Sequence, residues 1–385
     1  MKTYDLIIVG GGILGTFHAW HALKAGKKVL LLEKDNYPVG ATVRNFGQVV
    51  PSGMTGKWFE YGVRGLEIYG SIQQEFDISV RKNGTVYIAS DEDEQLLIHE
   101  LYDHYHTKGY ECTLLTRKAT LEKYPALKAS YTKEAIFFPR EISVEPPLMI
   151  YRLQEYMRDK FTNFNLLYNK VAVACESANG GAAVLLAGGE RQEAGKIIIC
   201  SGYEFKLLYP RIFEQSGLIV SKLQMMRTLP MPEVQLEGNI LTGLSIRRYE
   251  CFEECCPSFG RIKTPDHYAE LKKWGIHILF KKASDGSIII GDSHEYADVE
   301  HFDDLGFKLN QQVNELMLKE AERIVDFNVY NIDNCWAGFY PQHDAKHIFE
   351  LDVDENIHIR TGIGGKGMTA GAGYAEASFR KIFGA

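Results

Sequence analysis

Residues 4–33 read YDLIIVGGGILGTFHAWHALKAGKKVLLLE: an apolar strand pattern, a glycine turn, a helical pattern and a second apolar strand pattern. The turn has the spacing Gly10-x-Gly12-x-x-Gly15, which in this setting is typical of a dinucleotide-binding βαβ unit. Gly10 permits the tight turn, Gly12 lets backbone amides approach a pyrophosphate, and Gly15 lets the helix pack closely on the sheet. The positive end of the helix dipole points at the phosphates. The stretch therefore predicts a parallel sheet that binds a dinucleotide.

An acidic residue ends the second strand pattern. Glu33 lies 18 residues beyond Gly15, where a carboxylate accepts hydrogen bonds from both ribose hydroxyls of an adenosine. The same charge repels a 2′-phosphate, which disfavours NADP.

A second glycine-rich segment lies near the C-terminal end. Residues 359–369 read IRTGIGGKGMT and are followed by the helical stretch AGAGYAEASFRKIF, without the strand, GxGxxG and acid order of a nicotinamide domain. Amides at the start of this second helix suit a group that becomes anionic, as reduced flavin does. We therefore expect both glycine segments to meet one FAD; the alternative is a second nucleotide loop or a plain turn.

The composition favours a small-molecule ligand. At 385 residues the chain is long enough for about two domains, and its net charge of -7 offers no basic face for nucleic acid. Seven scattered cysteines make no disulfide framework, and CFEECC (251–256) lacks the spacing of a metal site, so we expect no metal. No run approaches the ~20 apolar residues of a membrane span, and we expect a cytoplasmic protein.

Strand and helix patterns alternate along the chain. Strands are expected over 84–89, 135–138, 171–175, 182–186, 196–200, 276–280 and 287–290, and helices over 57–76, 91–108, 147–161 and 310–325. Residues 196–202 (KIIICSG) read as a buried parallel strand that delivers a Ser-Gly turn to the nucleotide. The expected fold is α/β: a discontinuous FAD-binding domain of residues 1–80, 140–212 and 331–385, and a mostly antiparallel substrate domain of residues 81–139 and 213–330.

On these motifs the chain resembles the FAD-dependent amine oxidase superfamily, which includes D-amino-acid, glycine and sarcosine oxidases. Nearly the whole length takes part: the N-terminal fingerprint, ATVRNFGQ (41–48), residues 196–202, WAGFYP (336–341) and residues 362–369. RNFGQV (44–49), KLQMMRT (222–228), GIHILF (275–280) and IIIGDSHEY (288–296) are also similar to a bacterial subgroup proposed to act in phosphonate catabolism.

The resemblance implies a set of cofactor contacts. It places Gly10, Gly12 and Gly15 on the pyrophosphate and Glu33 on the ribose, with Ile13, Leu14 and Lys34 beside them. It places Arg44, Asn45, Phe46 and Gly47 along the pyrophosphate and flavin ring, Val171 at the adenine, Ser201 and Gly202 on the phosphate side, and Gly338, Gly364, Gly365, Lys366, Gly367, Met368 and Thr369 at the flavin.

The chain departs from this family at one position. Amino-acid oxidases of this group often read Trp-x-Gly-x-Arg-Pro, and their arginine clamps the substrate carboxylate; here Tyr340 stands in its place. An ordinary α-amino acid is therefore not the expected substrate. The resemblance implies instead a small primary or N-methyl amine carrying a phosphonate, oxidised to an imine that water hydrolyses to the aldehyde.

An anionic tail requires a cation, and arginine pairs well with phosphonate oxygens. Arg227, in an apolar run, and His277 and His294, in apolar strands, are the candidates, with Lys366 beside the flavin and Tyr340 as a hydrogen-bonding group. The alternatives are a structural ion pair for Arg227 and ordinary packing for the histidines and tyrosine.

Two other functions stay open: a glycine- or sarcosine-type oxidase of amino carboxylates, and a non-catalytic FAD-binding redox protein. Oxygen or another acceptor would reoxidise the flavin. Cys335, next to Trp336, is a candidate for covalent flavin attachment, but a free thiol and non-covalent FAD are expected.

Overall fold

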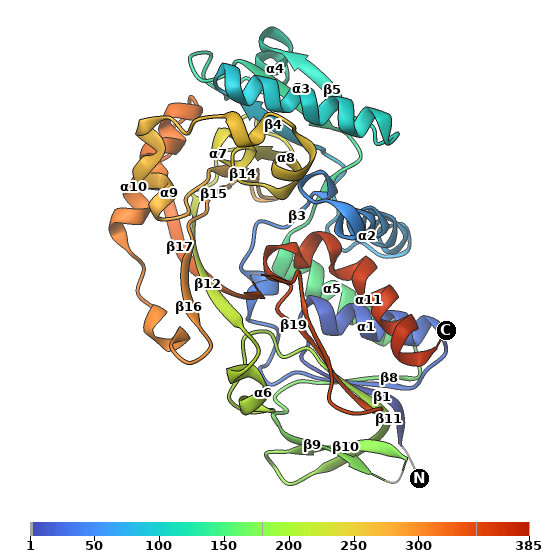
Figure 1. The fold of residues 1–385 in the computed structure, drawn as a ribbon. Coiled ribbons are helices and arrows are strands. Elements are labelled where there is room, and N and C mark those ends of the chain that lie inside the picture. Colours follow the sequence, from blue (N-terminus) through green and yellow to red (C-terminus); the bar gives the residue numbers. More distant parts are fainter. Residues whose placement is uncertain (1–2, 179, 344, 385) are drawn as a thin grey trace.

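The computed structural model describes residues 3–178, 180–343 and 345–384, and two sheets organise it (Figure 1). The first sheet has the order β18-β19-β11-β1-β2-β8, and the hairpin β9-β10 extends from β11. Its strands are β1 (Tyr4–Val9), β2 (Val29–Leu32), β8 (Phe164–Leu167), β9 (Ala172–Ala178), β10 (Gly181–Leu186), β11 (Arg191–Ile199), β18 (Phe349–Asp352) and β19 (Ile357–Thr361).

Parallel pairing brings distant segments to one edge of this sheet. β1 lies between β11 and β2 and is parallel to both, and β19 is parallel to β11. The carboxyl ends of these strands therefore meet, as in other nucleotide-binding sheets. The predicted strand over 196–200 is the end of β11, and it delivers Ser201 and Gly202 beside the glycine turn after β1.

Helices cover one face of the first sheet (Figure 1). α1 (Ile13–Lys24) and α11 (Gly367–Phe383) pack together, and α2 (Gly56–Glu75) lies on α11. α5 (Pro146–Lys160) contributes Met149, Leu153 and Met157 to the same core, in which these three side chains are fully buried. α2 and α5 agree with the predicted helices to within one residue at each end.

The second sheet is mostly antiparallel and has the order β16-β12-β15-β14-β13-β4-β6-β5, with β17 also paired to β12. Its strands are β4 (Thr85–Ala89), β5 (Thr113–Thr116), β6 (Glu134–Phe138), β12 (Leu218–Thr228), β13 (Asn239–Leu241), β14 (Leu279–Lys282), β15 (Ile288–Gly291), β16 (Glu295–Asp298) and β17 (Ile332–His343). β3 (Gln48–Val49) and β7 (Ile142–Ser143) form a short separate ladder.

The remaining helices lie mainly around the second sheet. They are α3 (Glu92–Thr107), α4 (Arg117–Lys123), α6 (Pro210–Glu214), α7 (Gly243–Ile246), α8 (Glu250–Cys255), α9 (Ala269–Lys273) and α10 (Gln311–Ile324). The mixed α/β fold agrees with the fold class expected from the sequence. None of the helices among the described residues combines the length and apolar character that a membrane crossing requires.

β17 bears on one of the expected domain boundaries. It is paired with β12 along nearly its whole length, from Leu218↔His343 to Thr228↔Ile332. Residues 332–343 were expected in the FAD-binding domain, but their strand belongs to the second sheet. We therefore propose that the second domain extends to the end of β17 and keep the other boundaries as proposed.

A buried carboxyl links the two parts of the chain. Glu141 is fully buried and accepts hydrogen bonds from the Ser52 amide (2.7 Å), the Ser52 hydroxyl (3.1 Å) and the Tyr110 hydroxyl (3.1 Å). Burial, only partly opposed by these donors, raises the pKa of Glu141 to about 7.

Glu141 is expected to make stability depend on pH. Because its folded pKa lies above its unfolded value, its stabilising contribution is present below about pH 4.5 and is lost as pH rises through 7. The loss between pH 5 and pH 8 is on the order of 2 kcal/mol. In Glu141→Gln the amide oxygen can accept from Ser52 and Tyr110 while the NH2 donates to the Ser52 hydroxyl, so this variant should show a flatter profile. Urea unfolding of both proteins at pH 5 and pH 8 measures the difference, and parallel profiles would contradict the assignment.

Candidate functional site

A cavity of about 220 Å³ opens at the carboxyl ends of the parallel strands. Its wall contains the glycine turn after β1, the end of β2, and Ser201 and Gly202 after β11. Val171 and Ala172 line it at the start of β9. Fragments from four places in the chain therefore enclose the volume where the glycine fingerprint predicts a nucleotide.

The glycines allow the turn to close. A Cβ on Gly15 would lie 1.9 Å from the Gly10 carbonyl oxygen, and one on Gly10, whose φ is +106°, would lie 2.3 Å from the Cys200 oxygen. A Cβ on Gly12 would meet only the Thr42 hydroxyl, at 3.1 Å. Gly10 and Gly15 thus hold the helix against the sheet, and Gly12 faces the cavity.

Glu33, which follows β2, lines the first cavity. Its Oε2 accepts a hydrogen bond from the Gly11 amide at 2.8 Å, and its Oε1 accepts one from the Asp35 amide at 3.0 Å. Each oxygen keeps a lone pair for a ribose hydroxyl. Burial, partly opposed by these two amides, raises the pKa of the carboxyl.

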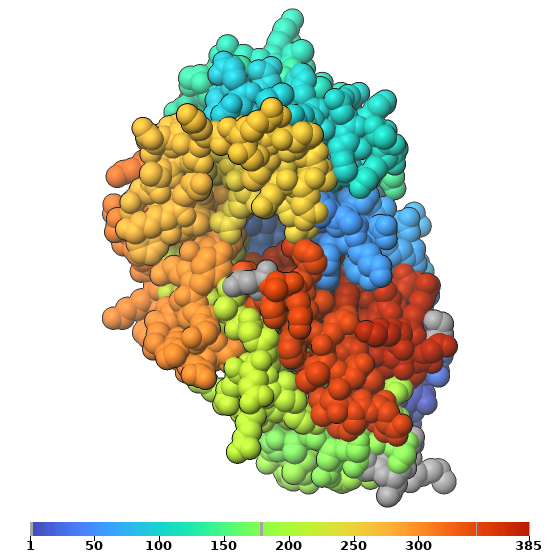
Figure 2. Space-filling model, viewed as in Figure 1, coloured from blue at the N-terminus to red at the C-terminus, as the bar shows by residue number. Residues whose placement is uncertain are grey.

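A second cavity of about 400 Å³ continues from the first. The two share the wall residues Ile13, Ala41, Thr42, Ile363 and Gly364. Figure 2 shows a hollow bordered by the yellow, blue and red segments of the chain, which include α8, α2 and the start of α11. The two cavities run from Glu33 to the start of α11.

FAD fits this pair of cavities. The first offers a glycine turn, a helix N-terminus and a carboxylate, the donors and acceptors that an adenosine diphosphate requires. The second is lined by Phe46 and by Gly365 to Thr369, where the N-terminus of α11 meets the volume. A positive helix end suits the flavin pyrimidine, which becomes negative on reduction.

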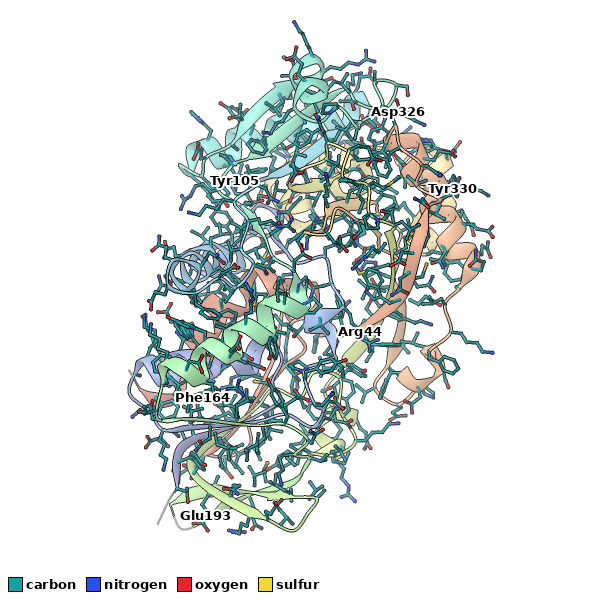
Figure 3. All side chains as sticks on the ribbon, turned by 180° about the vertical axis from the view of Figure 1, so that it is seen from behind. Arg44, Tyr105, Phe164, Glu193, Asp326 and Tyr330 are labelled. Atoms are coloured by element: carbon teal, nitrogen blue, oxygen red, sulfur yellow. The ribbon has the colours of Figure 1, made fainter. Side chains whose placement is uncertain are left out.

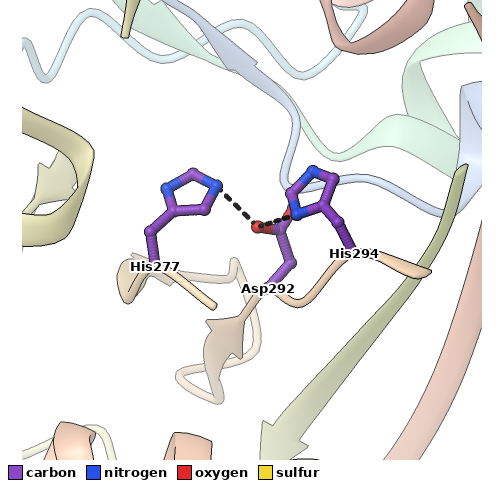
Figure 4. Close-up of side chains that lie close together, drawn as sticks. All are labelled: His277, Asp292 and His294. Carbon is purple, nitrogen blue, oxygen red and sulfur yellow. Dashed lines mark ion pairs between the residues drawn. The ribbon is translucent and has the colours of Figure 1, made fainter. Parts of the chain in front are cut away.

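The opposite wall of the second cavity contains two histidines and a carboxylate (Figure 4). His277 and Asp292 are opposite each other just beyond β14 and β15, and their backbones exchange hydrogen bonds of 3.1 and 2.9 Å. Their side chains therefore meet, with His277 Nε2 2.8 Å from Asp292 Oδ1. His294 Nδ1 lies 4.0 Å from the same oxygen.

Burial strongly affects the protonation of His277, Asp292 and His294. It lowers the pKa of His277 and lowers that of His294 to about 3, so both imidazoles are neutral at pH 7. Burial alone would raise the pKa of Asp292, but His277, His294 and Arg248 outweigh it and hold this pKa below the usual range. The wall therefore presents one carboxylate between two neutral rings.

The two cations that line the second cavity differ in their partners. Lys366 Nζ is paired with Glu250 at 2.8 Å. Arg248 donates to the Gly275 carbonyl at 2.8 Å and to the Tyr296 hydroxyl at 3.3 Å, and it has no carboxylate partner among the described residues. Arg248 is thus available to an anion in the cavity.

Most of the predicted cofactor residues line one or both cavities. They are Gly10, Gly12, Ile13, Leu14, Glu33, Lys34, Asn45, Phe46, Val171, Ser201, Gly202, Gly364, Gly365, Lys366, Gly367, Met368 and Thr369. Of the predicted catalytic residues, His277, Tyr340 and Lys366 line the second cavity.

Four predicted cofactor residues support the walls but do not line them: Gly15, Arg44, Gly47 and Gly338. Arg44 donates to the carbonyls of Val39 and Ala337 at 2.7 and 3.1 Å, which ties its loop to β17. Figure 3 shows it between the two sheets. The Arg44 side chain therefore lines neither cavity, and a contact of this residue with the pyrophosphate and flavin ring stays a prediction.

The Arg227 side chain lies outside both cavities. Arg227 lies near the end of β12, is paired with Asp285 at 2.5 Å, and has a side chain 38% exposed. The structural ion pair, considered as its alternative role, is what the structure shows. Leu223, four residues earlier on the same strand, is the β12 residue that reaches the cavity.

Sequence reasoning did not select Asp292 or Arg248. Asp292 directly follows the apolar run IIIG and precedes His294 by two residues, a signal that could have been used. Arg248 follows Arg247, which pairs with Glu94 at 2.7 Å and Asp91 at 2.6 Å. The sequence alone does not tell which of two adjacent arginines is paired with a carboxylate.

Comparisons with known proteins agree with the geometry. Residues 5–378 match the model of a family described as FAD dependent oxidoreductase. A glycine oxidase of Bacillus licheniformis is 22% identical over 352 residues, which are 89% of this chain and 82% of that protein.

Two solved structures share the fold. The glycine oxidase from Bacillus cereus superposes with a TM-score of 0.78 at 18% identity, over 99% of this chain and 95% of that one. The L-α-glycerophosphate oxidase from Mycoplasma pneumoniae, solved with FAD bound, has a TM-score of 0.78 at 17% identity, over 100% and 95% of the two chains.

Proposed function

We propose, because the chain belongs to the FAD dependent oxidoreductase family, that it oxidises a small primary or N-methyl amine whose other end carries a phosphonate. The observation that carries this proposal is Arg248, which lines the cavity next to the predicted flavin site and has no carboxylate partner in the part of the chain that the structure describes. Its guanidinium can form paired hydrogen bonds to an oxyanion.

The position of Tyr340 supports the substrate class. Tyr340 is buried, lines the second cavity, and has a pKa that burial raises, so it stays a neutral hydrogen-bonding group. It cannot pair with a carboxylate at the amine-bearing carbon as an arginine would. An anion held by Arg248 would instead form the far end of a longer molecule.

The protein's task at the amine end is alignment in a dry site. Bound FAD would supply the acceptor of two electrons and a hydrogen from the amine carbon. Phe46, Leu223 and Leu279 give this cavity apolar walls, and the Tyr249 and Tyr340 hydroxyls can orient the amine nitrogen. Water would then hydrolyse the imine to an aldehyde and ammonia or an amine.

Anaerobic reduction of the flavin tests the proposal. Loss of flavin absorbance is followed with 2-aminoethylphosphonate, its N-methyl derivative, glycine, sarcosine and propylamine as the tail-free control. We expect rapid reduction by one or both aminophosphonates and slow reduction by propylamine. Equal rates with all five amines would contradict the phosphonate assignment, and no reduction by any of them would favour a non-catalytic flavoprotein.

Oxidation of glycine or sarcosine is the second candidate. The likeness to the glycine oxidase of Bacillus licheniformis favours it. In that case Arg248 would hold a carboxylate, and the two amino carboxylates would reduce the flavin faster than the aminophosphonates.

A further inference from the structure

We propose that His277, Asp292 and His294 form a binding site for a divalent transition-metal ion such as Zn²⁺ in the wall of the second cavity (Figure 4). One ligand atom from each residue lies within 4.8 Å of the others. Two imidazole nitrogens and one carboxylate oxygen are a known ligand set for zinc and other first-row metals.

One ring nitrogen of each imidazole, Nδ1, already has a hydrogen-bonding neighbour. His277 Nδ1 lies 3.1 Å from the Ser245 hydroxyl, and His294 Nδ1 lies 3.0 Å from the Gly275 carbonyl. A carbonyl only accepts, so Nδ1 of His294 carries the hydrogen and its Nε2 keeps a lone pair. Metal-binding histidines are usually held in this way by a hydrogen bond at the other ring nitrogen.

The nearest partner of the Asp292 carboxylate among the described residues is an imidazole and not a lysine or arginine. Asp292 is 7% exposed, and its Oδ1 has no hydrogen-bond partner among the described residues although His277 Nε2 lies 2.8 Å away. No lysine or arginine among those residues is paired with it either. An anion buried without a paired cation is costly, and a metal ion between Asp292 and the two rings would offset this cost.

The hairpin makes the site rigid. His277 and Asp292 are held opposite each other by two backbone hydrogen bonds, and His294 follows two residues later. All three line the cavity, so coordination positions not filled by protein would face its volume.

A metal ion at this site would also affect binding of the substrate's phosphonate. This part of the inference rests on the proposed function. Arg248 and His294 donate to the same Gly275 carbonyl and are therefore neighbours. Without a metal the charges of Arg248 and Asp292 cancel, whereas a divalent ion leaves two positive charges in this wall. That charge matches a phosphonate dianion.

Calorimetric titration of the chelator-treated, FAD-containing protein with Zn²⁺ tests the site. We expect one Zn²⁺ per chain in the wild type and no binding of Mg²⁺, which prefers oxygen ligands. Asp292→Asn and His294→Asn should bind zinc about 100-fold more weakly or not at all, and Ser245→Ala about 10- to 100-fold more weakly. His106→Asn, an exposed histidine of α3, is the matched control and should bind like the wild type.

Flavin content is measured for every variant to show that each is folded. Absence of zinc binding by the wild type, or equal binding by Asp292→Asn, would overturn the metal site and leave the three residues as a hydrogen-bonded wall. The zinc titration is repeated in the presence of 2-aminoethylphosphonate. Tighter zinc binding supports the proposal that metal ion and phosphonate bind next to each other, and unchanged binding overturns that proposal. Zinc binding by an enzyme that oxidises no amine would uphold the site and reject the proposed function.

Discussion

Arg248→Ala is expected to lower kcat/KM for the preferred aminophosphonate by roughly 10- to 100-fold, equivalent to about 1.5 to 3 kcal/mol. The substitution removes a charge-assisted contact to the anionic tail. The effect should stay below that of a fully buried pair, because the Arg248 side chain is exposed to solvent. Most of the loss should be in KM, since the tail is held equally before and during the reaction. Steady-state kinetics with equal FAD occupancy measures the change.

Two comparisons make this result specific. Propylamine, which has no anionic tail, should be a poor substrate that is nearly indifferent to Arg248→Ala. Arg227→Ala removes a half-exposed ion pair with Asp285 outside both cavities and should leave kcat/KM within about twofold of the wild type. An Arg248→Ala enzyme as active as its parent, or an impaired Arg227→Ala enzyme, would show that the tail is bound elsewhere.

Gly15→Ala is expected to abolish stoichiometric FAD binding. The added Cβ would lie 1.9 Å from the Gly10 carbonyl oxygen, and this neighbour is backbone, so relief requires the glycine turn to open. Overpacking of this kind costs about 1 to 3 kcal/mol in stability, and it displaces the amides that meet the pyrophosphate. Flavin absorbance per protein and the midpoint of urea unfolding measure the two effects.

Gly70→Ala is the matched control. Gly70 lies within α2, and a Cβ there would meet no atom within 4 Å. This substitution should stabilise the protein by about 0.5 to 1 kcal/mol, because alanine favours the helix, and should leave FAD occupancy unchanged. Full FAD occupancy in Gly15→Ala would mean that the turn does not bind the cofactor as proposed.

Local patterns in the sequence predicted the elements that carry the nucleotide site. Buried strands, amphipathic helices and turns leave signals within a few residues, because each depends on side-chain periodicity or on a backbone that only glycine adopts easily. The helices at α2, α3, α5 and α10 agree with the prediction to within one residue at each end. The long strands β12 and β17 were not predicted, and their pairing is the reason for the different domain boundary that we propose.

The sequence by itself thus determined the glycine turn after β1, the acid at the end of β2 and the mixed α/β class, since each depends on neighbours in the chain. Only the tertiary structure decided which charged side chains reach the second cavity. It placed Asp292 opposite His277, left Arg248 without a carboxylate partner in the described part of the chain, and paired Arg227 with Asp285 outside the cavity. The physical reason is that sheet register and the packing of distant segments, which no local pattern encodes, determine which side chains meet.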